Sequence, residues 1–374
     1  MKKVICFFII VCLICPTLNV YAVANSAKAA ILINADTGEV IYEHNADERL
    51  PMASTTKIMT GLLLCENGEL QKEITVTDQM IRVEGSSMGL LAGDKVTLHD
   101  LLYGLMLASG NDAANVIAYV LGGTINGFVK KMNNKADALG LNNTNFVTPS
   151  GLDAEEHYTS ARDLANLTRI ALQNEDFAAA VSSKSAVLNY GNPPYRRTLT
   201  NHNKLLKSFD GAIGVKTGFT KKSGRCLVSA AERDGKRVIA VTLKDPNDWA
   251  DHKELLEYGL SKINITEIKP DVQNYKIPVI SGEEAAITVD IEPFVFSSLS
   301  QENFSCTVNL PKFLYAPIEK GEVIGSVIYK SKDNVIEEID IKAEKQVSKV
   351  NLKVSIWEKI KENYKYIFAN IWEK

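Results

Sequence analysis

The sequence is poor in the residues that build metal sites. Its 374 residues include only 5 histidines and 6 cysteines. The histidines are scattered, without the H-E-x-x-H spacing or the paired cysteines that are typical of zinc sites. The glycine-rich patterns G-x-x-x-x-G-K-[ST] and G-x-G-x-x-G, which bind phosphates, are also missing. We therefore expect neither a metal ion nor a nucleotide cofactor.

An excess of positive charge is lacking as well. The chain has 42 lysines and arginines against 45 aspartates and glutamates, a formal net charge of −3. Proteins that bind nucleic acids need a basic surface to neutralise phosphates, so this balance argues against nucleic acid as a partner. Hydrophobic residues make up 45% of the chain and charged residues 23%, which is ordinary for folded domains and excludes extended disorder.

The apolar run near the N-terminus is too short to cross a membrane. It extends from Val4 to Ile14 and is stopped by Pro16, whereas a membrane-spanning helix takes about 20 residues. Two lysines precede the run and Ala22-Val23-Ala24 follows it, which is typical of a secretory signal. A lipoprotein signal is disfavoured because the bulky Ile14 precedes Cys15. We expect residues 1–24 to be removed and the mature protein to be exported.

The hydrophobic pattern predicts an α+β domain over residues 25–264. Strands are expected at 29–34 and 39–43, a buried helix at 54–65, and further helices over 100–173. Strands return at 213–217, 226–231 and 237–243 before a closing helix at 254–260. Short alternating runs then predict a small all-β domain, sandwich-like, over residues 265–350.

Residues 351–374 form a separate segment with aromatic and aliphatic residues at steps of three and four. The segment has five lysines and three glutamates in an otherwise acidic chain. An amphipathic helix with basic residues suits an anionic membrane surface. We expect this helix to anchor the protein peripherally at the extracytoplasmic face of the cell membrane, although packing on the β domain or on a partner is the alternative.

Ser54-Thr55-Thr56-Lys57 lies at the start of the predicted buried helix. Residues three apart share one helix face, so the Lys57 amine can reach the Ser54 hydroxyl, and the helix N-terminus favours negative charge at the serine. A serine needs an adjacent base to become a strong nucleophile, and a lysine serves as that base when burial or a second cation lowers its pKa.

Two further motifs offer the remaining groups of such a site. Lys216-Thr217-Gly218 lies in a predicted strand, where a glycine allows close approach of a peptide backbone. Ser109-Gly110-Asn111 lies between two predicted helices, in a loop that can direct a hydroxyl and an amide into a cleft. Each tripeptide is uninformative by itself.

Taken in the order in which they occur along the chain, the three motifs match the S-x-x-K, S-x-N and K-T-G signature of penicillin-binding proteins and serine β-lactamases. From Ala29 to Leu260 the chain resembles the D-alanyl-D-alanine carboxypeptidases, low-molecular-mass penicillin-binding proteins of the penicillin-binding protein 5 type. Further matches include Asp36-Thr37-Gly38, Pro149-Ser150-Gly151-Leu152 and Leu255-Leu256. The resemblance implies a β-lactamase/transpeptidase-like fold, with an antiparallel sheet flanked by helices and a helical subdomain.

The resemblance also implies substrates and roles. The substrates would be peptidoglycan stem pentapeptides ending in D-Ala-D-Ala, and β-lactam antibiotics would acylate the same serine. The catalytic residues would be Ser54 as nucleophile, Lys57 as general base, Ser109 as proton relay and Lys216 as a positive charge. The substrate would be bound by Asn111, Lys216, Thr217, Gly218 and Phe219, with the backbone N–H groups of Ser54 and Phe219 forming the oxyanion hole.

The sequence departs from the family pattern at one position, and it leaves several alternative functions open. Many relatives have a carboxylate-binding arginine seven residues before the paired leucines, where this chain has Asp248. A class A β-lactamase is disfavoured because no E-x-x-L-N segment supplies a deacylating glutamate. A D,D-endopeptidase would use the same residues, and a penicillin-sensing module would stop at the acyl-enzyme. A purely structural cell-wall binder would have no use for the three motifs together.

Overall fold

The computed structural model describes residues 26–270, 275–299, 304–331, 334–350 and 361. The predicted signal and all of the predicted terminal helix except Lys361 lie outside these residues. The described chain divides into an N-terminal unit that extends to Ser261 and a C-terminal unit from Lys262 onward, which also includes the turn Asp234–Lys236. Each unit is considered by itself.

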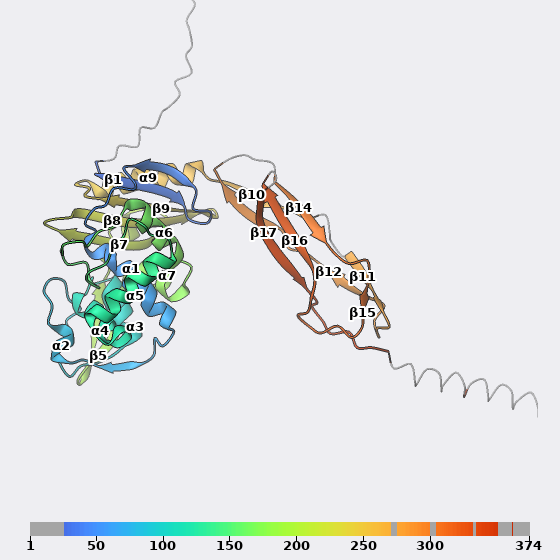
Figure 1. The fold of residues 1–374 in the computed structure, drawn as a ribbon, viewed down its shortest axis with the longest axis horizontal. Helices are drawn as coiled ribbons and strands as arrows, with labels where there is room; N and C mark the ends of the chain where they lie inside the picture. The colour runs from blue at the N-terminus through green and yellow to red at the C-terminus, as the bar shows by residue number, and fades with distance from the viewer. Residues whose placement is uncertain (1–25, 271–274, 300–303, 332–333, 351–360, 362–374) are drawn as a thin grey trace, which may run out of the picture. The chain divides into compact units, whose positions relative to one another are not determined.

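A five-stranded antiparallel sheet organises the N-terminal unit (Figure 1). Its strand order is β2-β1-β9-β8-β7. Every residue of β1 is buried, and Ile31 in β1 lies opposite Val241 in β9. The bounds are β1 Ala29–Asn34, β2 Val40–His44, β7 Ala212–Thr220, β8 Gly224–Arg233 and β9 Lys236–Leu243.

Helices cover both faces of this sheet. Gly259 of α9 packs against Leu32 and Val238 on one face, and α6 packs against β1. Helix α1 lies among α3, α4, α5, α6 and α7 and is almost entirely buried. The helices are α1 Lys57–Asn67, α2 Asp78–Ile81, α3 Leu98–Met106, α4 Asn111–Gly122, α5 Ile125–Ala138, α6 Ala161–Ala171, α7 Glu175–Ser182, α8 Leu205–Ser208 and α9 Asp248–Lys262.

A second sheet of the N-terminal unit was not predicted from the sequence. It has the strand order β3-β4-β5-β6. Its main component is the hairpin of β5 and β6, in which most side chains are exposed or half-buried. The bounds are β3 Glu73–Thr75, β4 Lys95–Thr97, β5 Ser185–Gly191 and β6 Pro194–Thr200.

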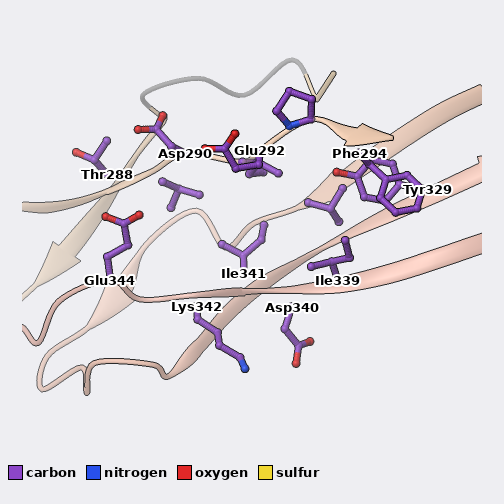
Figure 2. A pocket seen from close by; sticks show the side chains of 14 residues that line it. Thr288, Asp290, Glu292, Phe294, Tyr329, Ile339, Asp340, Ile341, Lys342 and Glu344 are labelled. Atoms are coloured by element: carbon purple, nitrogen blue, oxygen red, sulfur yellow. The ribbon is translucent and has the colours of Figure 1, made fainter. Parts of the chain in front are cut away.

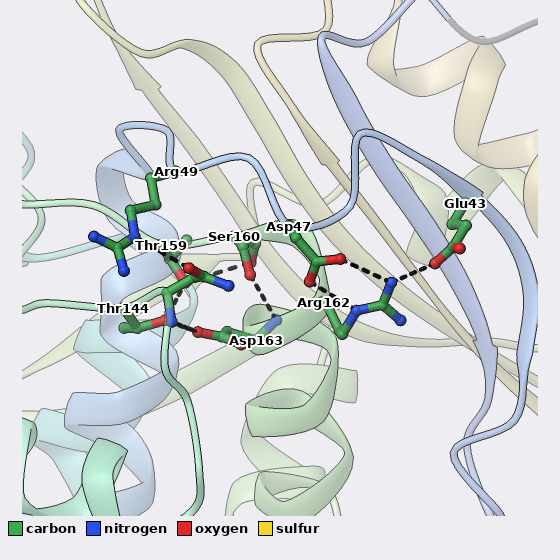
Figure 3. Close-up of polar contacts among 9 residues, drawn as sticks. Glu43, Asp47, Arg49, Thr144, Thr159, Ser160, Arg162 and Asp163 are labelled. Carbon is green, nitrogen blue, oxygen red and sulfur yellow. Dashed lines mark hydrogen bonds and ion pairs between the residues drawn. The ribbon is translucent and has the colours of Figure 1, made fainter.

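Polar contacts fix the start of α6 (Figure 3). The Ser160 hydroxyl accepts a hydrogen bond from the Asp163 backbone N–H at 3.1 Å, which caps the helix. The Asp163 carboxylate accepts hydrogen bonds from the Asn143 N–H and the Thr144 hydroxyl, and Arg162 pairs with Asp47 and Glu43. These contacts hold the first turn of α6 against residues 43–47 and 143–144.

The C-terminal unit consists of small sheets around its own apolar core, so the prediction of a sheet domain is confirmed. Ile277, Ile287, Ile318, Val327 and Tyr329 are buried in that core. The strands are β10 Asn264–Ile268, β11 Tyr275–Ile280, β12 Ala286–Val289, β13 Phe294–Ser298, β14 Phe304–Asn309, β15 Leu314–Tyr315, β16 Val323–Ser331 and β17 Asn334–Lys342. Within the described residues, no helix has both the length and the apolar composition that a membrane span requires.

Candidate active site

Ser54 lies in a turn of 3-10 helix, η1 Ala53–Thr56, directly before α1. The α-helix begins at Lys57 rather than at Ser54, because the Thr55 and Thr56 hydroxyls bond to the carbonyls of Met52 and Ala53 and tighten the turn. The spacing still brings the two groups together, with Lys57 Nζ 3.0 Å from Ser54 Oγ. Ser54 is partly accessible and Lys57 is fully buried.

Lys57 has two further partners, Asn111 Oδ1 at 2.7 Å and the Ser150 carbonyl at 2.6 Å. Burial lowers the pKa of Lys57 well below its usual value of 10.5, and the charge of Lys216 lowers it further. A neutral amine keeps two N–H groups for Asn111 and Ser150 and directs its lone pair at the serine. Lys57 is therefore positioned and poised to accept the Ser54 proton.

The second lysine lies in β7 and is also buried. Lys216 Nζ contacts Ser109 Oγ at 3.1 Å and the Thr217 carbonyl at 2.9 Å. Burial lowers the pKa of Lys216 to about 7. Ser109 joins α3 to α4 with a φ of +57°, a strained conformation that directs its hydroxyl toward Lys216.

Asn111 opens α4 and is held from both ends of its amide. Its Oδ1 accepts a hydrogen bond from Lys57, and its Nδ2 donates one to the Glu84 carbonyl at 2.6 Å. The neighbouring Asp112 carboxylate accepts backbone N–H groups of Met88, Gly89 and Leu90. This network fixes the loop after α2 over the start of α4.

Thr217, Gly218 and Phe219 follow Lys216 along β7, the last strand of the five-stranded sheet. A Cβ at Gly218 would lie 3.1 Å from the Met52 carbonyl and from the Ser54 backbone nitrogen. The Ser54 segment itself therefore packs tightly against this glycine, in addition to any approach of a peptide. Phe219 is 66% exposed.

The Ser150 carbonyl is a contact that the sequence analysis did not assign. Gly151, with a φ of +88°, allows this loop to press against the nucleophile segment, since a Cβ there would lie 1.9 Å from the Ala53 carbonyl oxygen. His157 ties the two segments together: its Nδ1 accepts the Val147 N–H and its Nε2 donates to Thr56 Oγ1 at 2.8 Å. Burial lowers the pKa of His157 to about 4, so the ring is neutral.

A cavity of about 280 Å³ opens onto these groups. Ser54, Ser109, Thr217, Gly218 and Phe219 line it, so five of the predicted site residues share one cavity. Lys57, Asn111 and Lys216 are not among the lining residues. Lys57 contacts Ser54, Lys216 contacts Ser109, and Asn111 contacts Lys57. Five further lining residues were not predicted from the sequence; they are Ser86, His202, Lys204, Arg225 and Trp249.

Asp248 also lines the cavity, and it is paired with a cation. Its carboxylate, 5% exposed, lies 2.7 Å from the guanidinium of Arg225 on β8. The Arg225 side chain is 41% exposed and also lies over the Trp249 ring, which Lys204 approaches as well. The cavity therefore carries accessible positive charge on the side formed by α9 and β8.

A second hollow of about 250 Å³ lies in the C-terminal unit (Figure 2). Its lining includes the acidic side chains of Asp290, Glu292 and Glu344 toward one end and the rings of Phe294 and Tyr329 at the other. None of the residues that line it is a serine or a cysteine, and Lys342 is the lysine among them. The arrangement lacks the hydroxyl–amine pair that the first cavity offers for acyl transfer.

Comparison with known proteins agrees with this geometry. The chain matches the family described as D-alanyl-D-alanine carboxypeptidase over residues 17–247 and the penicillin-binding protein 5 C-terminal domain over residues 268–349. D-alanyl-D-alanine carboxypeptidase DacF of Bacillus subtilis (strain 168) is 33% identical over 341 residues, covering 87% of each chain.

Two solved structures have the same fold. The D-alanyl-D-alanine carboxypeptidase DacD of Francisella tularensis has a TM-score of 0.62 and 28% identity, and the match covers 87% of this chain and 95% of that one. The DD-transpeptidase of Streptomyces K15 has a TM-score of 0.61 and 35% identity over 64% of this chain and 98% of that one. The chain thus belongs to the D-alanyl-D-alanine carboxypeptidase family of serine peptidases.

Proposed function

We propose that this protein removes the terminal D-Ala from peptidoglycan stem pentapeptides through an acyl-enzyme on Ser54, and that penicillins acylate the same serine. The contact of 3.0 Å between Lys57 Nζ and Ser54 Oγ carries this proposal. A buried lysine whose pKa is lowered is a suitable base for a serine nucleophile.

The reaction begins when Lys57 takes the hydroxyl proton and Ser54 Oγ bonds to the carbonyl carbon of the penultimate D-Ala. The backbone N–H groups of Ser54 and Phe219 donate hydrogen bonds to the developing oxyanion. In comparable enzymes each such donor stabilises the transition state by about 3–4 kcal/mol. The C–N bond then breaks and the leaving D-Ala amine takes a proton through Ser109, which Lys216 contacts. Water attacks the acyl-enzyme and releases the shortened peptide.

Substrate binding is assigned to the edge of β7 and to Asn111. Thr217, Gly218 and Phe219 line the cavity beside Ser54, as an extended peptide laid along β7 requires. Asn111 binds the substrate amide through Nδ2. The hydrogen bond that Nδ2 donates to the Glu84 carbonyl is then replaced by one to a substrate carbonyl.

The terminal carboxylate of the substrate is assigned to Arg225 together with Thr217. A free carboxylate that enters the cavity needs a positive partner, and the buried Lys216 already contacts Ser109 and the Thr217 carbonyl. The Arg225 guanidinium lines the same cavity and is partly exposed. Asp248 pairs with this guanidinium and holds it at the cavity. Arg225 on β8 therefore supplies the positive charge that many relatives take from an arginine at the position of Asp248.

Export and membrane attachment belong to the same proposal. The basic and apolar pattern of residues 1–24 supports export, and the amphipathic pattern of residues 351–374 supports peripheral attachment at the extracytoplasmic face. Cell fractionation of a chain that ends at residue 350 tests the attachment. A truncated protein that stays with the membrane in full would contradict the proposal that residues 351–374 are needed for attachment.

Release of D-Ala from a diacetylated tripeptide ending in D-Ala-D-Ala tests the reaction. We expect turnover by the native chain and none by Ser54→Ala. Stable labelling by penicillin without D-Ala release would identify a penicillin-sensing module. Cleavage of a cross-linked dimeric peptide in preference to the pentapeptide would identify an endopeptidase.

A further inference from the structure

Three large apolar side chains lie exposed at one end of the C-terminal unit. Ile280 ends β11 and lies opposite Tyr315 of the parallel strand β15, and Phe313 precedes that strand. Their exposed fractions are 41% for Ile280, 45% for Phe313 and 66% for Tyr315. The rings of Phe313 and Tyr315 meet edge to face, with centroids 5.4 Å apart. We call these three residues the aromatic tip.

The aromatic tip is not part of the core of this unit. The same strands send Ile277, Val279 and Leu314 inward, where they pack with the other core residues. Residues on one strand alternate between faces, so Ile280 and Tyr315 point to the opposite side from that core. Phe313 and Tyr315 therefore form an exposed apolar surface that the core of this unit does not cover. Such a surface indicates a site of interaction with another molecule.

The chain leaves the C-terminal unit beside the aromatic tip. Gly282 pairs with Lys349, and the Val350 N–H donates a hydrogen bond to the Ser281 carbonyl at 2.9 Å. Ser281 follows Ile280 directly. The amphipathic sequence 351–374 therefore begins at the same end of the unit as the exposed aromatics, and β11 and β15 lie at the end opposite β10 (Figure 1).

The charges near the aromatic tip are of both signs. Lys312, Lys345 and Lys349 are exposed there, against Glu283 and Glu284. Lys345 pairs with Glu284. Aromatic rings flanked by lysines match the chemistry of a bilayer interface, where rings enter the headgroup region and ammonium groups meet anionic lipids.

We propose that Ile280, Phe313 and Tyr315 contact the surface of an anionic lipid bilayer directly, beside the segment 351–374. The C-terminal unit then has two attachments to the membrane, which fix its orientation as well as its location. This inference rests on the membrane attachment proposed above, and its test separates the two.

A fluorescent label tests the contact in the full mature chain. Lys312→Cys carries the label beside the intact aromatic tip, and Val295→Cys, 58% exposed on β13, carries it as the matched control. Cys306 is replaced by serine, and Cys65 and Cys226 are buried. Phosphatidylglycerol vesicles contain a lipid with a headgroup quencher. We expect at least twofold stronger quenching at position 312 than at position 295.

Equal quenching of the two labels on vesicle-bound protein would overturn the tip contact and leave the attachment by 351–374 standing. A full chain that does not sediment with the vesicles would overturn both. A third outcome is that the label at position 312 is shielded from solvent without any lipid, in a protein that elutes as a dimer in gel filtration. That result would assign the aromatic tip to contact with a second copy of the chain and overturn the lipid contact.

Substitutions give a second readout. We expect Phe313→Ser/Tyr315→Ser to bind these vesicles about tenfold more weakly, since it removes two rings from the interface. Val295→Ser is the control and binds like the native chain. Both keep their activity on a soluble peptide, which excludes misfolding of the catalytic residues. Equal vesicle binding of the two variants would contradict the proposal.

Discussion

The assignment of Arg225 to the substrate carboxylate leads to the sharpest prediction. Arg225→Gln removes the charge while it keeps a long polar side chain over Trp249. We expect kcat/KM for D-Ala release to fall about 5- to 30-fold. The measurement is the rate of D-Ala release from the diacetylated tripeptide at substrate concentrations below KM.

The magnitude follows from the environment of the guanidinium. Two opposite charges about 4 Å apart near a protein surface attract by about 4 kcal/mol. Arg225 is 41% exposed and already pairs with Asp248, so solvent and the resident carboxylate reduce that attraction to about 1–2 kcal/mol. Each 1.4 kcal/mol corresponds to a tenfold change in rate.

A matched substrate separates carboxylate binding from a general defect. The same peptide ending in D-alaninamide has no terminal charge, so Arg225→Gln should hydrolyse it as fast as the native chain does. Because the single substitution leaves the buried Asp248 without its partner, Arg225→Gln/Asp248→Asn serves as a second variant. If both variants lost activity equally on the acid and on the amide, Arg225 would be a structural residue and the assignment would be wrong.

Four further outcomes are expected. Ser54→Ala should abolish labelling by fluorescent penicillin while the circular dichroism spectrum stays native; persistent labelling would mean another nucleophile. The rate constant of penicillin acylation should fall above about pH 7 as Lys216 loses its proton, whereas a profile that stays flat from pH 7 to pH 9 would refute this role. His252 and His157 are buried, with pKa values lowered to about 3 and about 4, so below pH 6.5 the unfolded chain binds protons that the fold excludes. Each should reduce the free energy of unfolding by about 1.5 kcal/mol between pH 6.5 and pH 5, which urea titrations can measure, and equal midpoints would contradict this. Gly151→Ala should lower both the melting temperature and the acylation rate, because its Cβ would overlap the Ala53 carbonyl, and a native-like variant would contradict the packing argument.

The central chemistry of the site could be predicted because it is encoded by short patterns. Ser54 and Lys57 are neighbours on one turn, and the order of the three motifs identified Ser109, Asn111 and Lys216 before their contacts were known. The strands around β7 and the helix α1 were predictable for a related reason, since both are buried and follow simple hydrophobic patterns.

Other features could not be predicted because no local pattern carries them. The pair of Arg225 and Asp248 joins β8 to α9, and neither residue has a sequence neighbour that indicates the contact. The hairpin of β5 and β6 was missed because polar residues such as Asn189 and Arg196 fill its exposed positions. The tightening of the turn at Ser54 depends on hydroxyl contacts that a helical pattern does not register.

The pairing of β1 with β9 also sets the order of events during synthesis. The strand that contains Ile31 is made early, but its partner strand, which contains Val241, leaves the ribosome only after most of the unit has been made. A nascent chain therefore has no finished catalytic sheet to hold it folded, and long-range pairing of this kind forms slowly. For the export proposed above, this delay would keep the polypeptide unfolded enough to enter a narrow translocation channel until its last strand has emerged.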